Sequence, residues 1–350
     1  MELNSDIPLP QAAPMVAIVA NIKSDTAQNT ADAEAELDSI ETVRAIGVAL
    51  NRAGCRATLM IADKTLPERL AGEKPDFVFN IAEGIHGRTR EAQVPALLDM
   101  LHIPYTGSDA TTLCIALDKA LAKRFLATYR IKTPSYLLLH PGMRKIPPAI
   151  QFPVIVKPNA EGSSKGIPDM CIARTREELD ALLERNAALY HEDMLVESFV
   201  KGREFTVGLI GNEADVTVFS PMEIVYVRTP SDGFKVYSYT VKQDYKQYIQ
   251  YECPASLDAP VEKRMKADAK KIFLALNCQD FCRIDFRLSE DGRDVYFIEA
   301  NPLPGLAPDY SDYPMLAGFC GVPYDELIAR ILRAAIGRTG ASLRLAGVEA

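Results

Sequence analysis

The N-terminal part of the chain alternates apolar runs with segments whose apolar residues recur at helical spacing. Continuous apolar runs are typical of strands buried on both faces of a parallel sheet, so the alternation predicts a Rossmann-like sheet covered by helices. We expect strands at residues 15–20, 57–62 and 76–84, helices at residues 37–54, 90–101 and 113–129, a short strand and turn at residues 103–107, and a linker at residues 64–75.

The rest of the chain is richer in strands, and helices return towards its C-terminus. We expect strands at residues 132–139, 152–156, 194–200, 204–211, 221–227 and 235–242, and helices at residues 176–186, 257–277 and 323–336. This change in the pattern of expected strands and helices predicts domain boundaries near Ala110 and Lys201. The expected parts are an N-terminal arm at residues 1–14, a parallel α/β domain at 15–110, a central domain at 111–200 and a mixed α+β domain at 201–350.

Two alternating strands around an Asp-Gly turn, at residues 281–305, gather charged residues on one face. Pairing centred on the turn places Asp285 opposite Glu299 and Arg283 opposite Asn301, and strict alternation adds Phe297 to the same face. Two opposed carboxylates repel one another unless a cation lies between them, and their oxygens are ligands that Mg²⁺ accepts. The alternative is a solvated hairpin face without a function.

Composition narrows the class of protein. A chain of 350 residues suits two or three subdomains, and 48% apolar with 25% charged residues is ordinary for a globular protein. The net charge of -8 argues against nonspecific binding to nucleic acid or to anionic membranes. Seven cysteines without a CxxC pair indicate reduced thiols, and we find neither a signal peptide nor a membrane span, so we expect a cytoplasmic protein.

A lysine and a glycine- and serine-rich loop follow the strand at residues 152–156. Lys157 ends the strand, and residues 159–166 include Glu161, Ser163 and Ser164. Glycines let backbone N–H groups face an anion, and serine hydroxyls add donors, so the loop could cover phosphates while the lysine contacts one of them. A loop that is only flexible is an equally good interpretation of this motif alone.

Two acids flank the apolar end of the strand at residues 194–200. Main-chain groups from Phe199 to Val200, together with Glu197, would suit the edge of an adenine ring, and Glu204 would suit ribose hydroxyls. Taken in isolation, such a segment is more often a surface linker whose acids are solvated.

In this order, the motifs resemble the ATP-grasp fold and, more narrowly, the D-alanine:D-alanine ligase family. The resemblance extends from about residue 15 to residue 335. It is carried by IPYTGSD (103–109), LDKALAK (117–123), FPVIVKPNAEGSSKG (152–166), GREFTV (202–207), CRIDF (282–286) and EANPLPG (299–305). It implies an N-terminal Rossmann-like domain, a central nucleotide-lid domain and a C-terminal mixed-sheet catalytic domain.

The resemblance also implies roles for individual residues around ATP and two Mg²⁺ ions. Lys119 and Lys157 match the lysines that hold the phosphates. In the loop that closes over the phosphates, the matching residues are Glu161, Ser163 and Ser164. At the adenine hinge they are Glu197, Phe199 and Val200, and at the ribose the matching acid is Glu204. The family's magnesium ligands correspond to Asp285, Glu299 and Asn301. Its oxyanion donors correspond to Arg283 and the backbone N–H of Gly305, and its lid lysine corresponds to Lys242. The implied reaction joins a carboxylate to an amine through an acyl phosphate.

The departures from the family lie where its amino-acid substrates bind. Glu36 is the nearest acid for the first substrate's amino group, or is a solvated helix-start acid. The His86 loop carries Arg88 and Arg90, which would pair with a substrate carboxylate or with neighbouring acids. The lid lysine is followed by Gln243 and by extra tyrosines, rather than by the family's aromatic residue.

After Gly305 the expected serine is replaced by a run in which Tyr310 or Ser311 could bind a carboxylate, while Asp309 and Asp312 could repel one. The family resemblance implies D-alanyl-D-alanine synthesis, whereas the altered loop favours a relative that forms a different amide, as in mycosporine-type metabolism. A non-catalytic nucleotide-binding protein remains an alternative. A nicotinamide-dependent oxidoreductase is poorly supported because no glycine fingerprint follows the first strand. The family resemblance further implies small-molecule partners and a homodimer.

Overall fold

The computed structural model describes residues 10, 12–23, 37–141, 143, 150–161, 171–190, 192–228, 241, 245–343 and 345. The expected strand at residues 235–242 lies outside this part of the chain, apart from residue 241. Four of the expected site residues also lie outside it: Glu36, Ser163, Ser164 and Lys242.

The N-terminal sheet has three parallel strands in the order β2-β1-β3. The strands are β1 (Met15–Ala20), β2 (Arg56–Ile61) and β3 (Phe77–Asn80), and the helices are α1 (Ile40–Arg52), α2 (Leu66–Glu73) and α3 (Gln93–Leu101), which follows the short 3-10 turn η1 (Arg90–Ala92). β1 is almost wholly buried, as its unbroken apolar sequence predicts. The expected linker at 64–75 is wrong, because it contains α2, which starts with a proline in its first turn.

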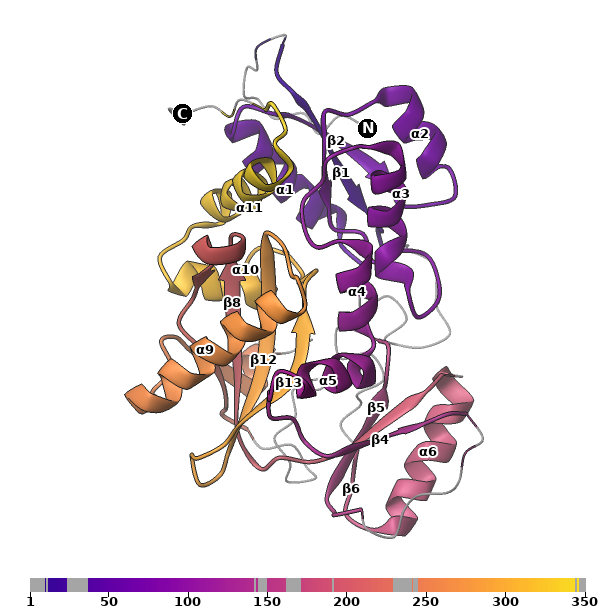
Figure 1. Cartoon of the computed structure of the whole chain (residues 1–350), viewed down its shortest axis with the longest axis vertical. Coiled ribbons are helices and arrows are strands. Elements are labelled where there is room, and N and C mark those ends of the chain that lie inside the picture. Colours follow the sequence, from indigo (N-terminus) through magenta and orange to yellow (C-terminus); the bar gives the residue numbers. More distant parts are fainter. Residues whose placement is uncertain are drawn as a thin grey trace.

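A second sheet, of four strands, lies at the opposite end of the molecule from the N-terminal sheet (Figure 1). Its order is β4-β7-β5-β6, and α6 packs against β5 and β6. The elements are β4 (Tyr136–Leu139), β5 (Val154–Pro158), β6 (Ile172–Ala173), α6 (Arg176–Tyr190) and β7 (Met194–Ser198). All neighbouring strands are antiparallel, and buried residues of β5, β7 and α6 form a separate small core.

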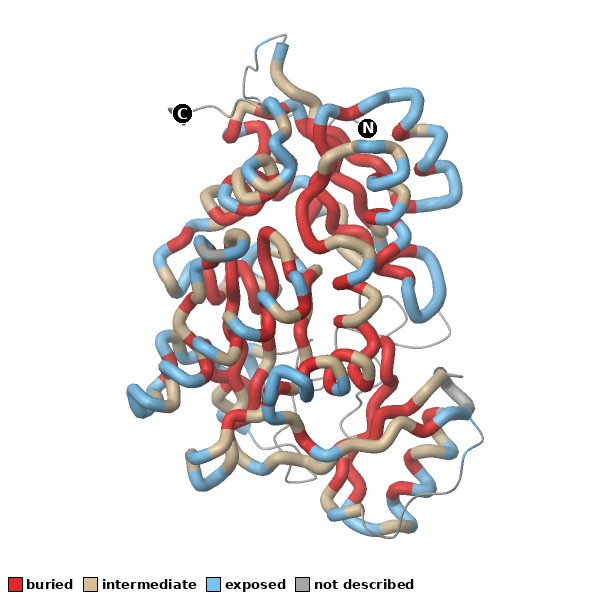
Figure 2. Tube along the Cα trace, viewed as in Figure 1, coloured by how far each residue is buried: buried red, intermediate tan, exposed pale blue. Residues whose placement is uncertain are grey.

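The third sheet is the largest and runs β11-β10-β8-β12-β13, with β9 paired to β8. Its strands are β8 (Gly202–Ile210), β9 (Thr217–Val218), β10 (Met222–Tyr226), β11 (Ile249–Glu252), β12 (Phe281–Ser289) and β13 (Val295–Asn301), and it is accompanied by η2 (Glu213–Asp215), α8 (Tyr245–Tyr248) and α9 (Ala259–Ala275). Apolar residues of α9 pack against one face of this sheet, and Figure 2 shows its central strands mostly in the colour of buried residues.

The last helices connect the largest sheet to the N-terminal sheet. They are α10 (Asp312–Phe319), which the sequence pattern did not predict, and α11 (Tyr324–Thr339), which lies beside α1 in Figure 1. Their buried residues join α1 and β1 in one hydrophobic core that also includes Phe281 and Tyr313. Within the described residues, no helix is long and apolar enough to cross a membrane.

The expected helix at 113–129 is in fact two helices, α4 (Ala110–Leu117) and α5 (Lys119–Ala127). Asp118 separates them in an extended conformation, and its side chain accepts a hydrogen bond from the N–H of Leu121. Asn159 contributes the other half of the junction, because its backbone carbonyl accepts from Lys119 N–H and its side chain contacts Asp118 and Ala120. The break therefore places Lys119 directly beside the end of β5.

Candidate functional site

The register of the β12–β13 hairpin is as predicted where the charged residues lie. Arg283 pairs with Asn301 and Asp285 with Glu299 across the two antiparallel strands. Beyond this point the register shifts, so that Phe286 pairs with Phe297 and Ile298 becomes the extra residue of a β-bulge. The prediction that Phe297 shares the face of Glu299 is wrong, because the bulge turns Phe297 into the core on the other face.

Arg283 is held by carboxylates on two sides. Its Nε and Nη2 donate to the two oxygens of Asp285, at 3.1 and 3.0 Å, and its Nη1 donates to Asp312 Oδ2 at 3.3 Å. Asn301 Nδ2 also donates to Asp285, at 3.0 Å. Burial alone would lower the pKa of Arg283, but Asp285 and Asp312 outweigh burial and raise that pKa. The guanidinium is therefore a permanent positive charge in a largely buried position.

Glu299 faces positive charge from another part of the chain. Its carboxylate lies 3.5 Å from the ammonium of Lys119, which also donates to the backbone carbonyl of Glu161 at 2.6 Å. Burial would raise the pKa of Glu299, but Lys119, Lys157 and Arg283 outweigh it and lower that pKa to about 2. For Asp285, burial is the dominant influence and raises the pKa. The charged form of Glu299 is therefore stabilised, whereas the charged form of Asp285 is disfavoured.

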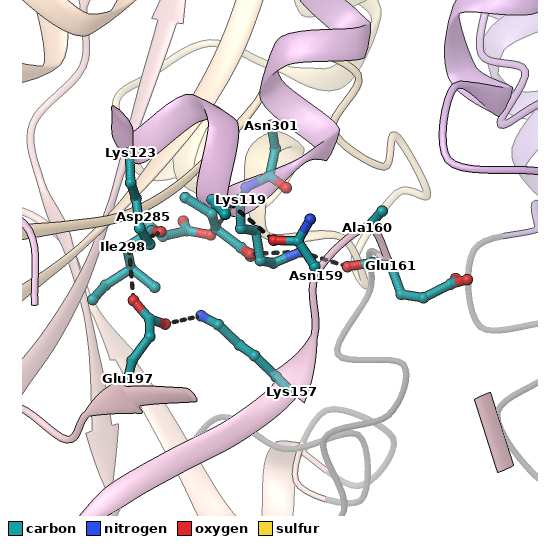
Figure 3. A network of polar contacts seen from close by, with 12 residues as sticks. Lys119, Lys123, Lys157, Asn159, Ala160, Glu161, Glu197, Asp285, Ile298 and Asn301 are labelled. Atoms are coloured by element: carbon teal, nitrogen blue, oxygen red, sulfur yellow. Dashed lines mark hydrogen bonds and ion pairs between the residues drawn. The ribbon is translucent and has the colours of Figure 1, made fainter. Parts of the chain in front are cut away.

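A second cluster of buried charges is centred on Glu197, at the end of β7 (Figure 3). Its two oxygens lie 2.8 Å from Lys123 Nζ and 2.7 Å from Lys157 Nζ, and all three side chains are almost completely buried. Burial would raise the pKa of Glu197, but the two ammonium groups outweigh it and lower that pKa. The predicted contact of Glu197 with an adenine edge would therefore have to be made beside this ion triad.

Lys123 is the clearest residue that sequence reasoning missed. It lies one helical turn after Lys119 on α5, and its side chain is fully buried, with hydrogen bonds to Thr133 Oγ1 and to the carbonyl of Ile298. Burial lowers its pKa to about 8, against the opposing effect of Glu197. The i, i+4 spacing of two lysines on one face was the available signal.

A third ion pair lies beside the predicted hinge. Arg287, another residue that sequence reasoning did not select, donates to Glu204 Oε2 at 3.0 Å and to the carbonyl of Val200 at 2.8 Å, and its guanidinium lies over the ring of Phe199. Tyr226 also donates to Glu204, at 3.0 Å. Burial raises the pKa of Glu204, against the opposing effects of Arg287 and Tyr226. Strand β12 therefore orders the hinge as well as the charged hairpin face.

The arginines of the His86 loop pair with neighbouring acids. Arg88 lies 3.3 Å from Asp118, and Arg90 donates to the carbonyl of Ala160 and lies 3.3 Å from Glu161. His86 itself is exposed. The two arginines were expected to pair either with a substrate carboxylate or with neighbouring acids, and in the structure both lie beside neighbouring acids. The loop after β3 is thereby tied to the segment that follows β5.

The Gly305 turn is packed closely against the start of α10. A Cβ built on Gly305 would lie 2.8 Å from Ser311 Oγ, so a side chain at this position would displace that serine. Ser311 is the N-cap residue of α10 and accepts a hydrogen bond from Ala307 N–H at 3.1 Å. Tyr310 is half-buried in the same turn. Both predicted substrate residues therefore lie next to the predicted oxyanion donor.

The hairpin face suits a magnesium ion by the chemistry of its donors. Asp285, Glu299 and Asn301 supply two carboxylates and an amide, and the side chains of the first two are 20% and 27% exposed. Among the described residues, no group of three or more His, Cys, Asp or Glu side chains could hold a metal ion. A cation here would depend on ligands from outside the protein, which matches the habit of Mg²⁺ of binding one or two carboxylates together with phosphates.

Comparison with known proteins identifies the family. Residues 134–333 match the family model described as D-ala D-ala ligase C-terminus. The D-alanine–D-alanine ligase of Citrifermentans bemidjiense is 34% identical over 85% of this chain and 91% of its own, and that of Syntrophotalea carbinolica is 35% identical over 87% and 92%.

A solved structure shares the fold. The D-alanine–D-alanine ligase from Bacillus anthracis complexed with ATP superimposes with a TM-score of 0.72 and 20% sequence identity, covering 94% of this chain and 99% of that one. The mixed architecture of one parallel and two antiparallel-rich sheets is therefore the ATP-grasp architecture that the motifs predicted. This chain belongs to the D-alanine–D-alanine ligase family of ATP-dependent ligases.

Proposed function

We propose that this protein uses ATP to join the carboxylate of one amino acid to the amine of another, with D-alanine as the first substrate to test. The observation that carries the proposal is the charged face of β12 and β13, on which Arg283, Asp285, Glu299 and Asn301 lie together. Lys119 reaches this face from α5, so a phosphate chain and an acyl carbon could be held side by side. The names of the relatives support the choice of D-alanine.

In the first step the substrate carboxylate attacks the γ-phosphate of ATP. Phosphoryl transfer depends mainly on positioning and on neutralisation of charge, and we assign those tasks to Lys119 and Lys157, with Glu204 and the Val200 segment at the nucleoside. Mg²⁺ held by Asp285, Glu299 and Asn301 would neutralise phosphate oxygens. Lys242 and the loop with Glu161, Ser163 and Ser164 are proposed to exclude water, because the acyl phosphate product would otherwise hydrolyse.

In the second step an amine attacks the acyl carbon, and phosphate leaves. The developing oxyanion needs donors that are already in place, and we assign Arg283 and the Gly305 N–H to it. His86, Arg88, Tyr310 and Ser311 remain proposed substrate residues, although the contact between Arg88 and Asp118 favours a supporting role for that arginine. The domain boundaries at 110 and 201, the homodimer and a cytoplasmic location also remain predictions.

A ligase that forms a different amide is the second candidate. The observation that favours it is the turn after Gly305, where Asp312 pairs with Arg283 and adds an acid beside the proposed site of the second substrate. A nucleotide-binding protein without turnover is the third, and the complete hairpin face argues against it.

Phosphate release and product mass distinguish the three candidates. The protein is incubated with ATP, Mg²⁺ and pairs of D- and L-amino acids, and we expect release with D-alanine alone, together with a product of the mass of a dipeptide. Release only with a different pair would establish the second candidate. If no pair releases phosphate while ATP still binds, the protein is a nucleotide binder and the proposal is wrong.

A further inference from the structure

Two segments in which this chain departs from its family contact each other. One is the tyrosine-rich stretch of α8 and β11, and the other is the turn from Ala307 to the start of α10. Tyr245 donates from its hydroxyl to the carbonyl of Asp309 at 3.1 Å, and Tyr251 donates to Asp312 Oδ1 at 2.7 Å. The two tyrosine rings also pack together, with centroids 5.7 Å apart. The departures therefore form one structural unit.

This unit reaches Arg283 through Asp312. Oδ1 of Asp312 accepts from Tyr251, and Oδ2 accepts from Arg283 Nη1, so both oxygens of the carboxylate are engaged. The Asp312 side chain is only 3% exposed. Burial of a carboxylate is costly unless the group is paired and hydrogen-bonded, and Arg283 and Tyr251 both contribute to this for Asp312.

The connection also bridges the sheet. Tyr251 lies on β11 and Arg283 on β12, with β10 and β8 between them, and three strand spacings correspond to about 14 Å. The strands give Tyr251 a fixed position, since it pairs with Ile224 of β10. Asp312 thus links the guanidinium to a rigid element on the far side of the sheet. Asp285, the other carboxylate on Arg283, belongs to β12 itself.

The arrangement leaves Arg283 able to bind a substrate oxygen. A guanidinium has five N–H donors, and the three contacts with Asp285 and Asp312 use one each on Nε, Nη1 and Nη2. One donor therefore remains on each terminal nitrogen for groups beyond these two acids. With two carboxylates on opposite sides, the plane of the guanidinium is held and cannot rotate towards either acid alone.

We propose that Asp312 and Tyr251 are positioning residues for Arg283, which hold its guanidinium towards the acyl carbon at which the amide bond forms. This inference rests on the proposed function of Arg283 as an oxyanion donor. Asp312 acts through Arg283 and does not itself touch substrate. The tie between Tyr245 and Asp309 fixes the turn that leads into Asp312.

The test compares isosteric variants. Asp312→Asn keeps the size of the side chain but removes its charge, and we expect kcat for product formation to fall about 10- to 100-fold with KM for ATP unchanged, since small misplacement of a catalytic group has effects of this size. Tyr251→Phe removes one hydrogen bond, and we expect a fall of about 3- to 10-fold, the equivalent of a single modest hydrogen bond. Asp312→Glu keeps the charge and should retain more activity than the asparagine variant.

Asp180→Asn is the matched control, because it makes the same chemical change at an exposed position of α6, outside the proposed site. Asp180 pairs with Arg176 on the surface of the same helix, and such an exposed pair contributes little, so wild-type kcat is expected. A fall in kcat equal to that of Asp312→Asn would show that the enzyme is sensitive to the loss of any acidic charge and would contradict the positioning role.

A measurement that does not need turnover separates this inference from the proposed function. In protein labelled with ¹⁵N-arginine, the Nε–H signal of Arg283 is assigned by its loss in Arg283→Lys. We expect that signal to move and broaden in Asp312→Asn but not in Asp180→Asn. An unchanged signal, or an unchanged kcat in an active enzyme, would overturn the inference. If the wild type releases no phosphate with any substrate pair, the proposed function fails, while the Arg283 signal still decides whether Asp312 positions the guanidinium.

Discussion

The side of this site that we propose for the nucleotide and the side that we propose for the second substrate differ in how their charges are arranged. On the side proposed for the nucleotide, Glu197 of β7 pairs with Lys123 of α5 and with Lys157 of the neighbouring strand β5, and Glu299 of β13 pairs with Lys119 of α5. On the side proposed for the second substrate, Arg283 donates to Asp312 of α10, and the other oxygen of Asp312 accepts from Tyr251 of β11. The first side has an excess of lysine around its acids, whereas the second has an excess of acid around its arginine.

This difference fits the different tasks that we propose for the two sides. An excess of lysine suits a polyanion such as a nucleotide triphosphate, because the lysines can be shared between protein acids and phosphates. An arginine between two acids presents only part of its donors, which suits a single oxygen atom. We therefore expect substitutions on the proposed nucleotide side to cause the larger losses of turnover and folding stability. Substitutions on the proposed second-substrate side should change rate and specificity by smaller amounts.

The largest effect is expected from Glu299→Gln. The change removes a charge that faces Lys119 and would hold Mg²⁺, so we expect turnover to fall about 1,000-fold or more, the upper end of what loss of one electrostatic group causes. Phosphate release at saturating substrates measures it. Glu290→Gln, in the exposed turn of the same hairpin, should retain full activity. Substantial activity in the Glu299 variant would remove this hairpin from the proposed mechanism.

The face of this hairpin could be predicted from sequence because its signals are local. The Asp-Gly turn predicts the pairing of Asp285 with Glu299, and alternation predicts that their side chains share a face. The bulge at Ile298 could not be predicted in this way, because the apolar pattern of β13 does not reveal an unpaired residue. The extra residue places Phe297 on the face opposite to the one that strict alternation predicts.

Long-range charge contacts were also beyond the reach of local patterns. Lys123 and Glu197 are 74 residues apart, and hydropathy treats each as a surface residue, yet both are buried because each neutralises the other. The break between α4 and α5 lies at Asp118, which accepts a hydrogen bond from Asn159, a residue 41 positions away at the end of β5. The contact between Asp312 and Tyr251 is of the same kind, and only the three-dimensional arrangement brings those departures together.

The next largest effect is expected in folding stability from Lys123→Met. Methionine fills a similar volume, but Glu197 then keeps Lys157 as its one lysine partner in the triad, and loss of one member of a buried ion cluster costs roughly 3 kcal/mol. We expect the free energy of unfolding in urea to fall by about this amount. Arg124→Met, at the adjacent exposed position of α5, is the control. A stability equal to that of the wild type would mean that the triad is held by Lys157 alone.

The smallest effect concerns Asp38, which lies two residues after Glu36, the acid predicted to contact the first substrate. Burial raises its pKa to about 7, and Lys23 opposes this only in part. Because the folded protein holds this proton more tightly than the unfolded chain does, the contribution of Asp38 to stability is fully present below pH 4 and is lost as the pH rises through about 7.

Asp38→Asn should therefore be more stable than the wild type at pH 8, by about 1–2 kcal/mol after allowance for solvent screening, and the difference should disappear near pH 4. Urea unfolding at several pH values measures this slope, and Glu68→Gln at an exposed helix position is the control. The sign of the difference decides the matter. If Asp38→Asn instead becomes less stable than the wild type as the pH rises, the charged Asp38 carboxylate is stabilised by a nearby cation in the wild type. Asp38 would then resemble Glu197 and Glu299, the lysine-paired acids of the proposed nucleotide side.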